Sequence, residues 1–187
     1  MGSLSDAATY IFYSTLAMYV FLAIMYGIAF MSLASSSFDM TSTASPMIVN
    51  LLMVLYFGFT VAFILALYGY VLLYVAIRDY NKVKKVGSPA ISILSFFIPI
   101  IGYPFLAGIL ERINGNLKTP AKLLKLTVVL LLIAIILMIP FASVSLGESL
   151  EAVLAFAIIE FIFFFGGLIS NIIAWGLVYV RAKKLDL

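Results

Sequence analysis

Two long stretches without charge constrain this chain more than any other feature. Residues 7–38 and 40–77 contain no Asp, Glu, Lys or Arg, and Asp39 alone separates them. Each stretch exceeds the roughly 20 apolar residues with which a helix crosses the hydrocarbon core of a bilayer. With 65% hydrophobic and 10% charged residues, the chain also lacks the charged surface of an ordinary soluble domain. The sequence therefore predicts an all-α integral membrane protein.

Four segments are predicted to span the membrane, at about residues 7–33, 47–77, 121–146 and 151–180. The first has neither the basic start nor the small-residue cleavage site of a signal peptide, so we expect it to remain in the mature protein. No internal repeat and no low-complexity linker divides the chain. We therefore expect a single polytopic membrane domain over residues 1–187.

Residues 90–113 are apolar enough to be a fifth span but contain two prolines near their centre. A proline lacks the amide donor and clashes with the preceding turn, so we expect a broken helix with limbs at 90–98 and 105–113. Each limb would be about 13 Å long, too short to cross the membrane. The break is expected at Pro99, Gly102 and Pro104. This predicts a re-entrant or interfacial helical hairpin; the alternative is a proline-kinked full span.

The distribution of charge favours the hairpin over the fifth span. A fifth span would divide the 11 Lys and Arg residues between the two sides of the membrane. A hairpin places all 11 on one side and leaves Asp39, Glu148 and Glu151 on the other. Cytoplasmic loops collect Lys and Arg. We therefore expect a multi-pass protein of the cell membrane with both termini and both basic loops in the cytoplasm.

Glu160 is the one charged residue predicted inside a span, roughly 14 Å from Glu151 along the last helix. No Lys or Arg falls in the interior of a predicted span to act as its counter-ion, since Lys122 and Lys125 lie at the very start of the 121–146 segment. Acidic residues inside the membrane commonly serve a function, so this carboxyl is a candidate to bind a proton or a cation during transport. The alternative is a carboxyl hydrogen-bonded to another helix or facing a partner subunit.

Asn171 lies about three helical turns beyond Glu160, on nearly the same face of the last helix. The two form a polar stripe that could line a wet cavity. Tyr56 and Thr60 in the second predicted span are the candidates to face Glu160, which completes the predicted ion or proton site. For Asn171 alone, a hydrogen bond between helices is the commoner role.

Small residues recur every four positions on two predicted spans. Such seams let another helix approach closely, either within the chain or in a second copy. The two predicted packing seams are Gly58, Ala62 and Ala66, and Gly166, Ser170 and Ala174.

Residues near the expected membrane surface fall into two groups. The 11 tyrosines are expected mostly as interfacial anchors, with Tyr68, Tyr70 and Tyr74 forming a belt ahead of Arg78. Basic side chains beside the spans are candidate contacts for anionic lipid headgroups, at about 1 kcal/mol per charge, although they could act as orientation signals alone. These candidates are Lys82, Lys84, Lys85, Lys118, Lys122 and Lys125. Since the basic residues flank apolar runs, we expect no nucleic acid partner.

Enzyme motifs are missing from the sequence. The chain has no His and no Cys, which excludes Ser-His and Cys-His catalysis, the usual zinc sites and covalent haem attachment. It contains no HExxH, GxxxxGK[ST] or GxGxxG motif. We therefore expect a non-enzymatic protein without a metal or a cofactor.

Two functions fit this pattern. The first is a structural or accessory subunit of a larger membrane assembly, whose seams contact other membrane proteins or copies of itself as well as the lipid bilayer. The alternative is a small permease or channel for a proton, a cation or a small solute that uses Glu160, with the broken hairpin beside its route. A lipid-modifying enzyme ranks third.

Overall fold

The computed structural model describes residues 3–34, 46–144, 150–185 and 187, and the elements in these ranges are helices without a strand. Four of the helices are long and apolar enough to cross a membrane. The predicted fold class of an all-helical, multi-pass membrane protein is thereby confirmed. The elements are α1 (Leu4–Ala34), α2 (Pro46–Val83), α3 (Ala90–Phe97), α4 (Pro99–Ile113), the 3-10 turn η1 (Gly115–Leu117), α5 (Lys118–Val144) and α6 (Leu150–Lys184).

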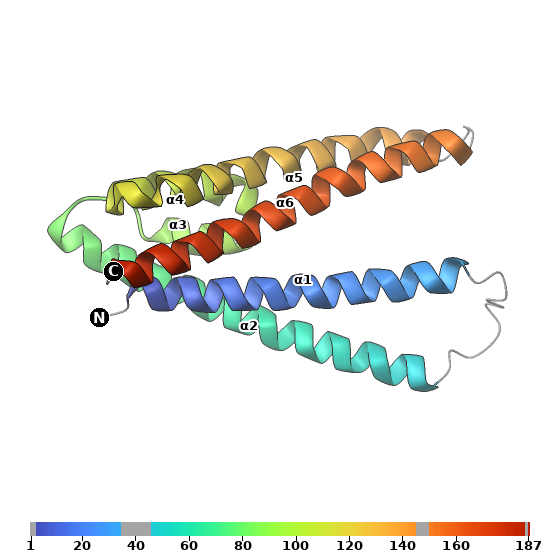
Figure 1. Ribbon diagram of the computed structural model, residues 1–187, viewed down its shortest axis with the longest axis horizontal. Helices are drawn as coiled ribbons and strands as arrows, with labels where there is room; N and C mark the ends of the chain where they lie inside the picture. Colours follow the sequence, from blue (N-terminus) through green and yellow to red (C-terminus); the bar gives the residue numbers. More distant parts are fainter. Residues whose placement is uncertain (1–2, 35–45, 145–149, 186) are drawn as a thin grey trace.

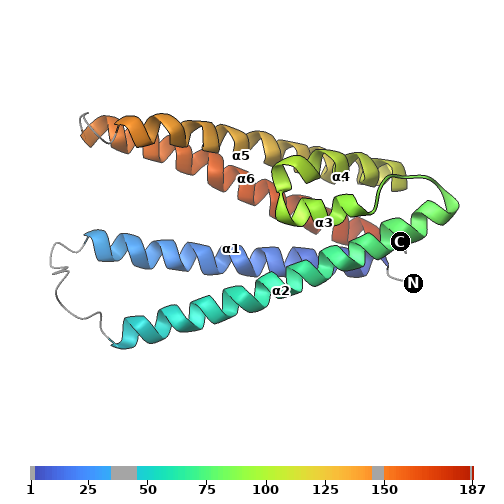
Figure 2. The same ribbon diagram turned by 180° about the vertical axis from the view of Figure 1, so that it is seen from behind.

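The long helices form two antiparallel pairs that α1 and α6 hold together. α1 packs along α2, α5 packs along α6, and α1 also contacts α6. The chain termini, the end of α2 and the beginning of α5 meet at one end of the bundle (Figures 1 and 2). The 11 Lys and Arg residues lie in the last turns of α2, the loop that follows it, the end of α4, the beginning of α5 and the end of α6, and we call this end of the bundle the basic end.

Two short helices, α3 and α4, form a hairpin at the basic end, where α3 contacts α2 and α4 contacts α5 (Figure 2). The hairpin turns at Ile98, and α4 begins directly at Pro99. The predicted break across residues 98–104 is therefore wrong in extent. Proline is well tolerated in the first turn of a helix, where its amide needs no partner, so Pro99 starts the second limb instead of interrupting it. Pro104 lies inside α4.

α2 continues beyond the predicted end at residue 77 to Val83. The added turns carry Asp79 and Lys82, whose side chains form an ion pair of 2.8 Å one helical turn apart. Such pairs stabilise an exposed helix end modestly. At 38 residues α2 is about 57 Å long, so it projects beyond a hydrocarbon core of about 30 Å.

The buried core lies at the basic end, around the hairpin. It is formed by side chains of α1, α2, α4, α5 and α6, among them Ile11, Leu73, Leu106, Leu124 and Trp175. Large apolar side chains farther along the helices, such as Val54, Ile136 and Ile162, are exposed. Lipid is the solvent that such a surface requires.

Two of the acidic residues predicted on the other side of the membrane, Asp39 and Glu148, lie outside the described residues.

Candidate functional site

A cavity of about 250 Å³ lies between α1, α2, the hairpin and α6. Thr15 and Asn171 contribute polar side chains to its wall, and the hairpin turn contributes Pro99. The remaining lining is mostly aromatic: Tyr19, Phe59, Phe63, Tyr70, Phe96 and Tyr103. Concave sites with apolar walls and a few convergent polar groups are typical of small-molecule binding.

Asn171 joins α6 to α1 at this cavity. Its side chain is 5% exposed, and its Nδ2 donates a hydrogen bond of 2.8 Å to the hydroxyl oxygen of Tyr19. The other polar atom of the carboxamide, Oδ1, has no hydrogen-bond partner among the described residues. An unpaired buried acceptor is costly in an apolar interior. This oxygen is fully buried, so a ligand or a water molecule reaches it only if the side chains that cover it move.

A second polar contact links α2 to the hairpin. The hydroxyl oxygens of Tyr70 and Tyr103 are 3.0 Å apart and share a hydrogen bond. The indole of Trp175, which is fully buried, packs edge-on against the ring of Tyr70 with centroids 5.7 Å apart. Its Nε1–H has no hydrogen-bond partner within the described part of the chain. Three helices thus converge on one cluster of hydroxyl and indole groups.

Close contact between α3 and α4 holds the hairpin turn at the cavity. A Cβ atom at Gly102 would lie 2.3 Å from the Cα of Ser95, so only glycine permits this crossing. The Ser95 hydroxyl donates to the Ile91 carbonyl at 2.7 Å, which satisfies this buried polar group within its own helix. The crossing brings Phe96 of α3 and Tyr103 of α4 to the cavity wall together.

The base of the hairpin is fixed by Asn81 of α2. Its Oδ1 accepts from the backbone amides of Val86 and Gly87 at 2.9 and 3.3 Å, and its Nδ2 donates to the Gly87 carbonyl at 2.6 Å. Gly87 has a φ of +152°, a conformation that other residues adopt only with strain. Arg112 also donates to the Val86 carbonyl, at 3.2 Å. The connection from α2 to α3 is therefore anchored on both sides.

The groups around the cavity are suited to binding rather than to covalent chemistry. The polar members of the lining are hydroxyls and one carboxamide, and no charged side chain lines the cavity in the described ranges. Such groups exchange hydrogen bonds with a solute. The indole of Trp175 packs behind the wall, against Tyr70. Asn171 lies about 15 Å from Arg181 along α6.

The structure does not bring the predicted ion or proton site together. Glu160 is partly exposed on α6, about 16 Å from Asn171 along the helix axis. Tyr56 is 70% exposed on α2, and the Thr60 hydroxyl donates to the Tyr56 carbonyl at 2.9 Å within the same helix. Among the described residues, no hydrogen bond joins Glu160 to any of these side chains.

Both small-residue seams pack within the chain. A Cβ atom at Gly58 would lie 2.5 Å from the ring of Phe21, so this seam, with the buried Ala62 and Ala66, faces α1. The second seam faces α5: the Ser170 hydroxyl donates to the Leu123 carbonyl at 3.0 Å, a Cβ atom at Gly166 would be in van der Waals contact with Leu130, and Ala174 is fully buried.

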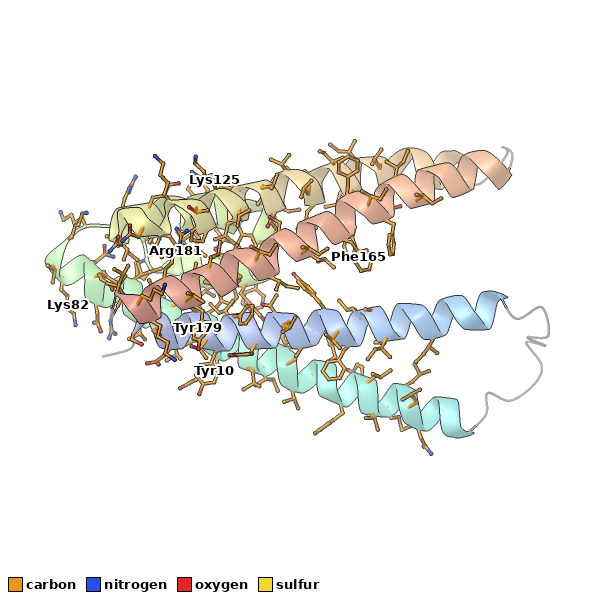
Figure 3. All side chains as sticks on the ribbon, viewed as in Figure 1. Tyr10, Lys82, Lys125, Phe165, Tyr179 and Arg181 are labelled. Atoms are coloured by element: carbon orange, nitrogen blue, oxygen red, sulfur yellow. The ribbon has the colours of Figure 1, made fainter. Side chains whose placement is uncertain are left out.

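The predicted lipid-contact lysines divide into two groups, and two of them, Lys82 and Lys125, are labelled in Figure 3. Some have partners within the chain: Lys82 pairs with Asp79 at 2.8 Å, Lys125 pairs with Glu111 at 3.1 Å, and Lys84 donates to the Arg112 carbonyl at 2.9 Å. The exposed remainder consists of Lys85, Lys118 and Lys122.

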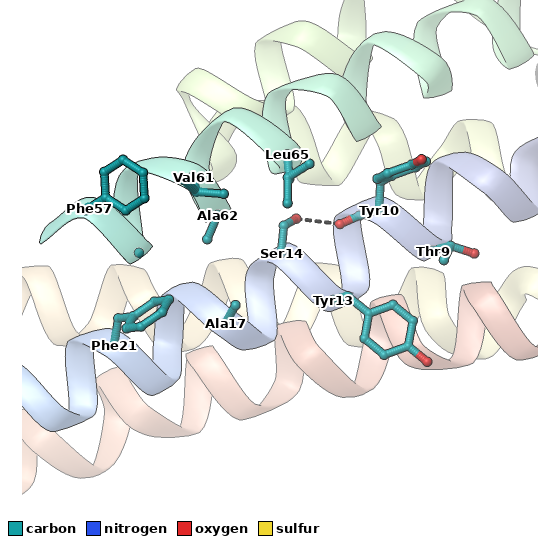
Figure 4. A pocket seen from close by; sticks show the side chains of 11 residues that line it. Thr9, Tyr10, Tyr13, Ser14, Ala17, Phe21, Phe57, Val61, Ala62 and Leu65 are labelled. Atoms are coloured by element: carbon teal, nitrogen blue, oxygen red, sulfur yellow. Dashed lines mark hydrogen bonds between the residues drawn. The ribbon is translucent and has the colours of Figure 1, made fainter. Parts of the chain in front are cut away.

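A larger hollow of about 600 Å³ lies between α1 and α2, lined by apolar side chains such as Phe21, Phe57 and Leu65 (Figure 4). The Ser14 hydroxyl in its wall already donates to the Tyr10 carbonyl. Because that hydroxyl already has a partner, it presents no unmet hydrogen bond to a ligand, and acyl chains of the bilayer suit such a groove.

Several residues in or directly behind the cavity wall were not predicted from the sequence. Tyr70 was expected in an interfacial belt, but it is 3% exposed and lies in the cavity wall, so that expectation is wrong. Tyr19, Tyr103 and Trp175 were not singled out. One available signal was the single Trp of the chain, which lies one helical turn beyond Asn171 on the same face.

Comparison with protein families, with curated proteins and with solved structures finds no match to this chain.

Proposed function

We propose that this protein is a small permease of the cell membrane that binds a small solute in the cavity beside Asn171. The observation that carries the proposal is the buried Oδ1 of Asn171, which has no partner in the described part of the chain and belongs to a residue that lines the cavity. With the basic end at one membrane surface, Asn171 would lie about 15 Å from Arg181, near the bilayer midplane. Binding sites of transporters commonly lie at this depth and are formed partly by discontinuous helices. The turn between α3 and α4 is such a discontinuity, and Pro99 in that turn lines the cavity.

In the proposed topology the basic end faces the cytoplasm, with both termini and both basic loops there. The hairpin of α3 and α4 then re-enters the membrane from the cytoplasmic side. α4 is about 22 Å long and α3 about 12 Å, so neither limb crosses a core of about 30 Å. The exposed Lys85, Lys118 and Lys122 would contact anionic headgroups on that side.

An accessory subunit is less well supported by the geometry. The accessory-subunit hypothesis assumed that the small-residue seams are available to other proteins. In the structure, Gly58 faces Phe21 of α1, and the Ser170 hydroxyl donates to the Leu123 carbonyl of α5. A partner protein would have to bind a different surface. Glu160 is not at the cavity, so the proposed permease depends on Asn171 rather than on an intramembrane acid.

The permease proposal is tested in liposomes that contain the purified chain. Uptake of urea, glycerol, tetramethylammonium and acetate is followed by light scattering as the vesicles swell. We expect at least one solute to enter faster than in protein-free vesicles, and Asn171→Leu to remove most of that increase. Asn50→Leu, the same substitution at an exposed position of α2 outside the cavity, is the matched control and should leave the rate unchanged. Uptake equal to that of empty vesicles for every solute would overturn the proposal.

A further inference from the structure

We infer that the Asn171 cavity binds a small uncharged solute that carries both a hydrogen-bond donor and a hydrogen-bond acceptor, as carboxamides and polyols do. The inference rests on the proposed function only in taking this cavity as the solute site. It goes further by assigning the chemical class of the solute.

The donor of the solute is required by Asn171. The carboxamide uses its Nδ2 toward Tyr19, while Oδ1 has no partner in the described part of the molecule. A carboxamide oxygen only accepts hydrogen bonds. Oδ1 is fully buried, so a bound molecule reaches it only when the side chains that cover it move. That molecule then has to present an N–H or O–H group to satisfy it.

The acceptor of the solute is required by the tyrosines. Tyr19 accepts the bond from Asn171, which leaves its own hydroxyl proton free to donate. The single bond between Tyr70 and Tyr103 uses one of their two hydroxyl protons and leaves the other. Tyr19, Tyr70 and Tyr103 all line the cavity, so their free hydroxyl protons are the donors available to a bound molecule.

The absence of charge around the cavity argues for an uncharged solute. No Asp, Glu, Lys or Arg lines it in the described ranges, and Glu160 lies about three helical turns away on α6. An ion without a counter-charge is strongly disfavoured in an apolar interior. The aromatic wall could attract an organic cation. A quaternary ammonium, however, carries no N–H group for the Asn171 oxygen, so the geometry favours the neutral class.

The volume limits the size of the solute. A cavity of about 250 Å³ corresponds to about eight water molecules at about 30 Å³ each, which is room for a molecule of about that number of heavy atoms or fewer.

Trp175 gives the test a direct readout, because it is the only Trp of the chain and it packs against Tyr70 of the cavity wall. The full-length protein in mild detergent is titrated with acetamide, urea and glycerol as neutral probes, with acetone as an acceptor without a donor, and with tetramethylammonium and acetate as ions. We expect saturable changes of Trp175 emission with one or more neutral probes that carry a donor, and none with acetone or the ions.

Variants assign the binding to the named atoms. Asn171→Leu is expected to lower the affinity for the neutral probe at least about fivefold. Tyr103→Phe, which keeps the ring, is expected to lower this affinity about threefold. Tyr13→Phe, outside the cavity, should have no effect. Gel filtration shows whether each variant is folded, and Tyr103→Phe keeps the test decisive if Asn171→Leu does not fold.

Each remaining outcome decides between alternatives. Saturation by tetramethylammonium alone overturns the neutral class in favour of an organic cation, and no saturation by any probe means that the cavity holds water only. Saturable neutral binding without uptake into liposomes leaves this inference standing and overturns the permease.

Discussion

Gly102 of α4 lies against Ser95 of α3 so closely that a Cβ atom at Gly102 would come within 2.3 Å of the Cα of Ser95 and 2.5 Å of its amide nitrogen. The obstructing atoms belong to the backbone, which cannot rotate away as a side chain can. The two limbs of the hairpin therefore depend on glycine at this position.

Gly102→Ala should lower the stability of the protein by at least about 2 kcal/mol, because the two limbs must separate to admit the methyl group. The measurement is the apparent melting temperature in mild detergent, followed by Trp175 emission. Gly108→Ala is the matched control on the same helix, since a Cβ atom there meets nothing within 4 Å. It should be neutral or stabilise α4 by up to about 1 kcal/mol. Equal melting temperatures for the two variants would contradict the close crossing.

The same hairpin shows how far the sequence predicts this fold. Long apolar runs, prolines and charge clusters are local signals, so the four long helices and a break near Pro99 are predictable from them. The exact turn is not, because Pro99 can either interrupt a helix or begin one. Which occurs depends on the contact between Gly102 and Ser95, which lie on different helices.

The cavity depends even more on neighbours that a sequence pattern does not specify. Asn171 stands out because polar residues are rare in spans, but its partner Tyr19 lies on a helix at the other end of the chain. Tyr68 and Tyr70 look equivalent in sequence, yet Tyr68 is exposed and Tyr70 is buried. The difference is set by which face of α2 meets the hairpin, and composition alone carries no information on that.

Tyr19→Phe should destabilise the protein modestly, because it leaves the Nδ2 donor of Asn171 without its acceptor. Hydrogen bonds between membrane helices are worth about 0.6 kcal/mol on average and up to about 1.7 kcal/mol, so we expect a loss within this range. Tyr13→Phe removes a hydroxyl from a side chain that is 54% exposed and should have no measurable effect. Thermal unfolding of both variants in the same detergent makes the comparison, and an equal loss in both would contradict the bond.

Gly58→Ala tests whether the first seam packs within the chain. The added methyl group meets the ring of Phe21, so we expect a loss of about 1–3 kcal/mol in stability. Phe21→Leu in the same chain should recover part of this loss, with a coupling energy of at least about 0.5 kcal/mol in a double-mutant cycle. If Gly58→Ala instead changed the oligomeric state in detergent and left stability unaltered, the seam would join two copies.

Glu160→Gln should leave binding at the cavity unchanged, because about 16 Å of helix separates Glu160 from Asn171. The measurement is the titration of Trp175 emission with the neutral probe, compared with Asn171→Leu. The rate of solute uptake into liposomes should also remain within about twofold of that of the parent protein. Loss of one net hydrogen bond of about 1 kcal/mol would change the rate by more than this. A clear loss of uptake with intact binding would return Glu160 to the transport route.

The proposed topology predicts which side of the membrane each basic loop occupies. The chain contains no cysteine, so a single introduced cysteine is labelled uniquely by an impermeant maleimide. Val83 is 92% exposed and Asn116 is exposed, so Val83→Cys and Asn116→Cys are suitable positions on the two sides of the hairpin. Both should be protected in intact cells and labelled in inverted vesicles, because α3 and α4 enter and leave by the same face.

Ser37→Cys, in the predicted loop between the first two spans, should show the opposite pattern. Labelling of positions 83 and 116 from opposite sides would mean that residues 90–113 cross the membrane, and the hairpin turn would then not be a re-entrant element.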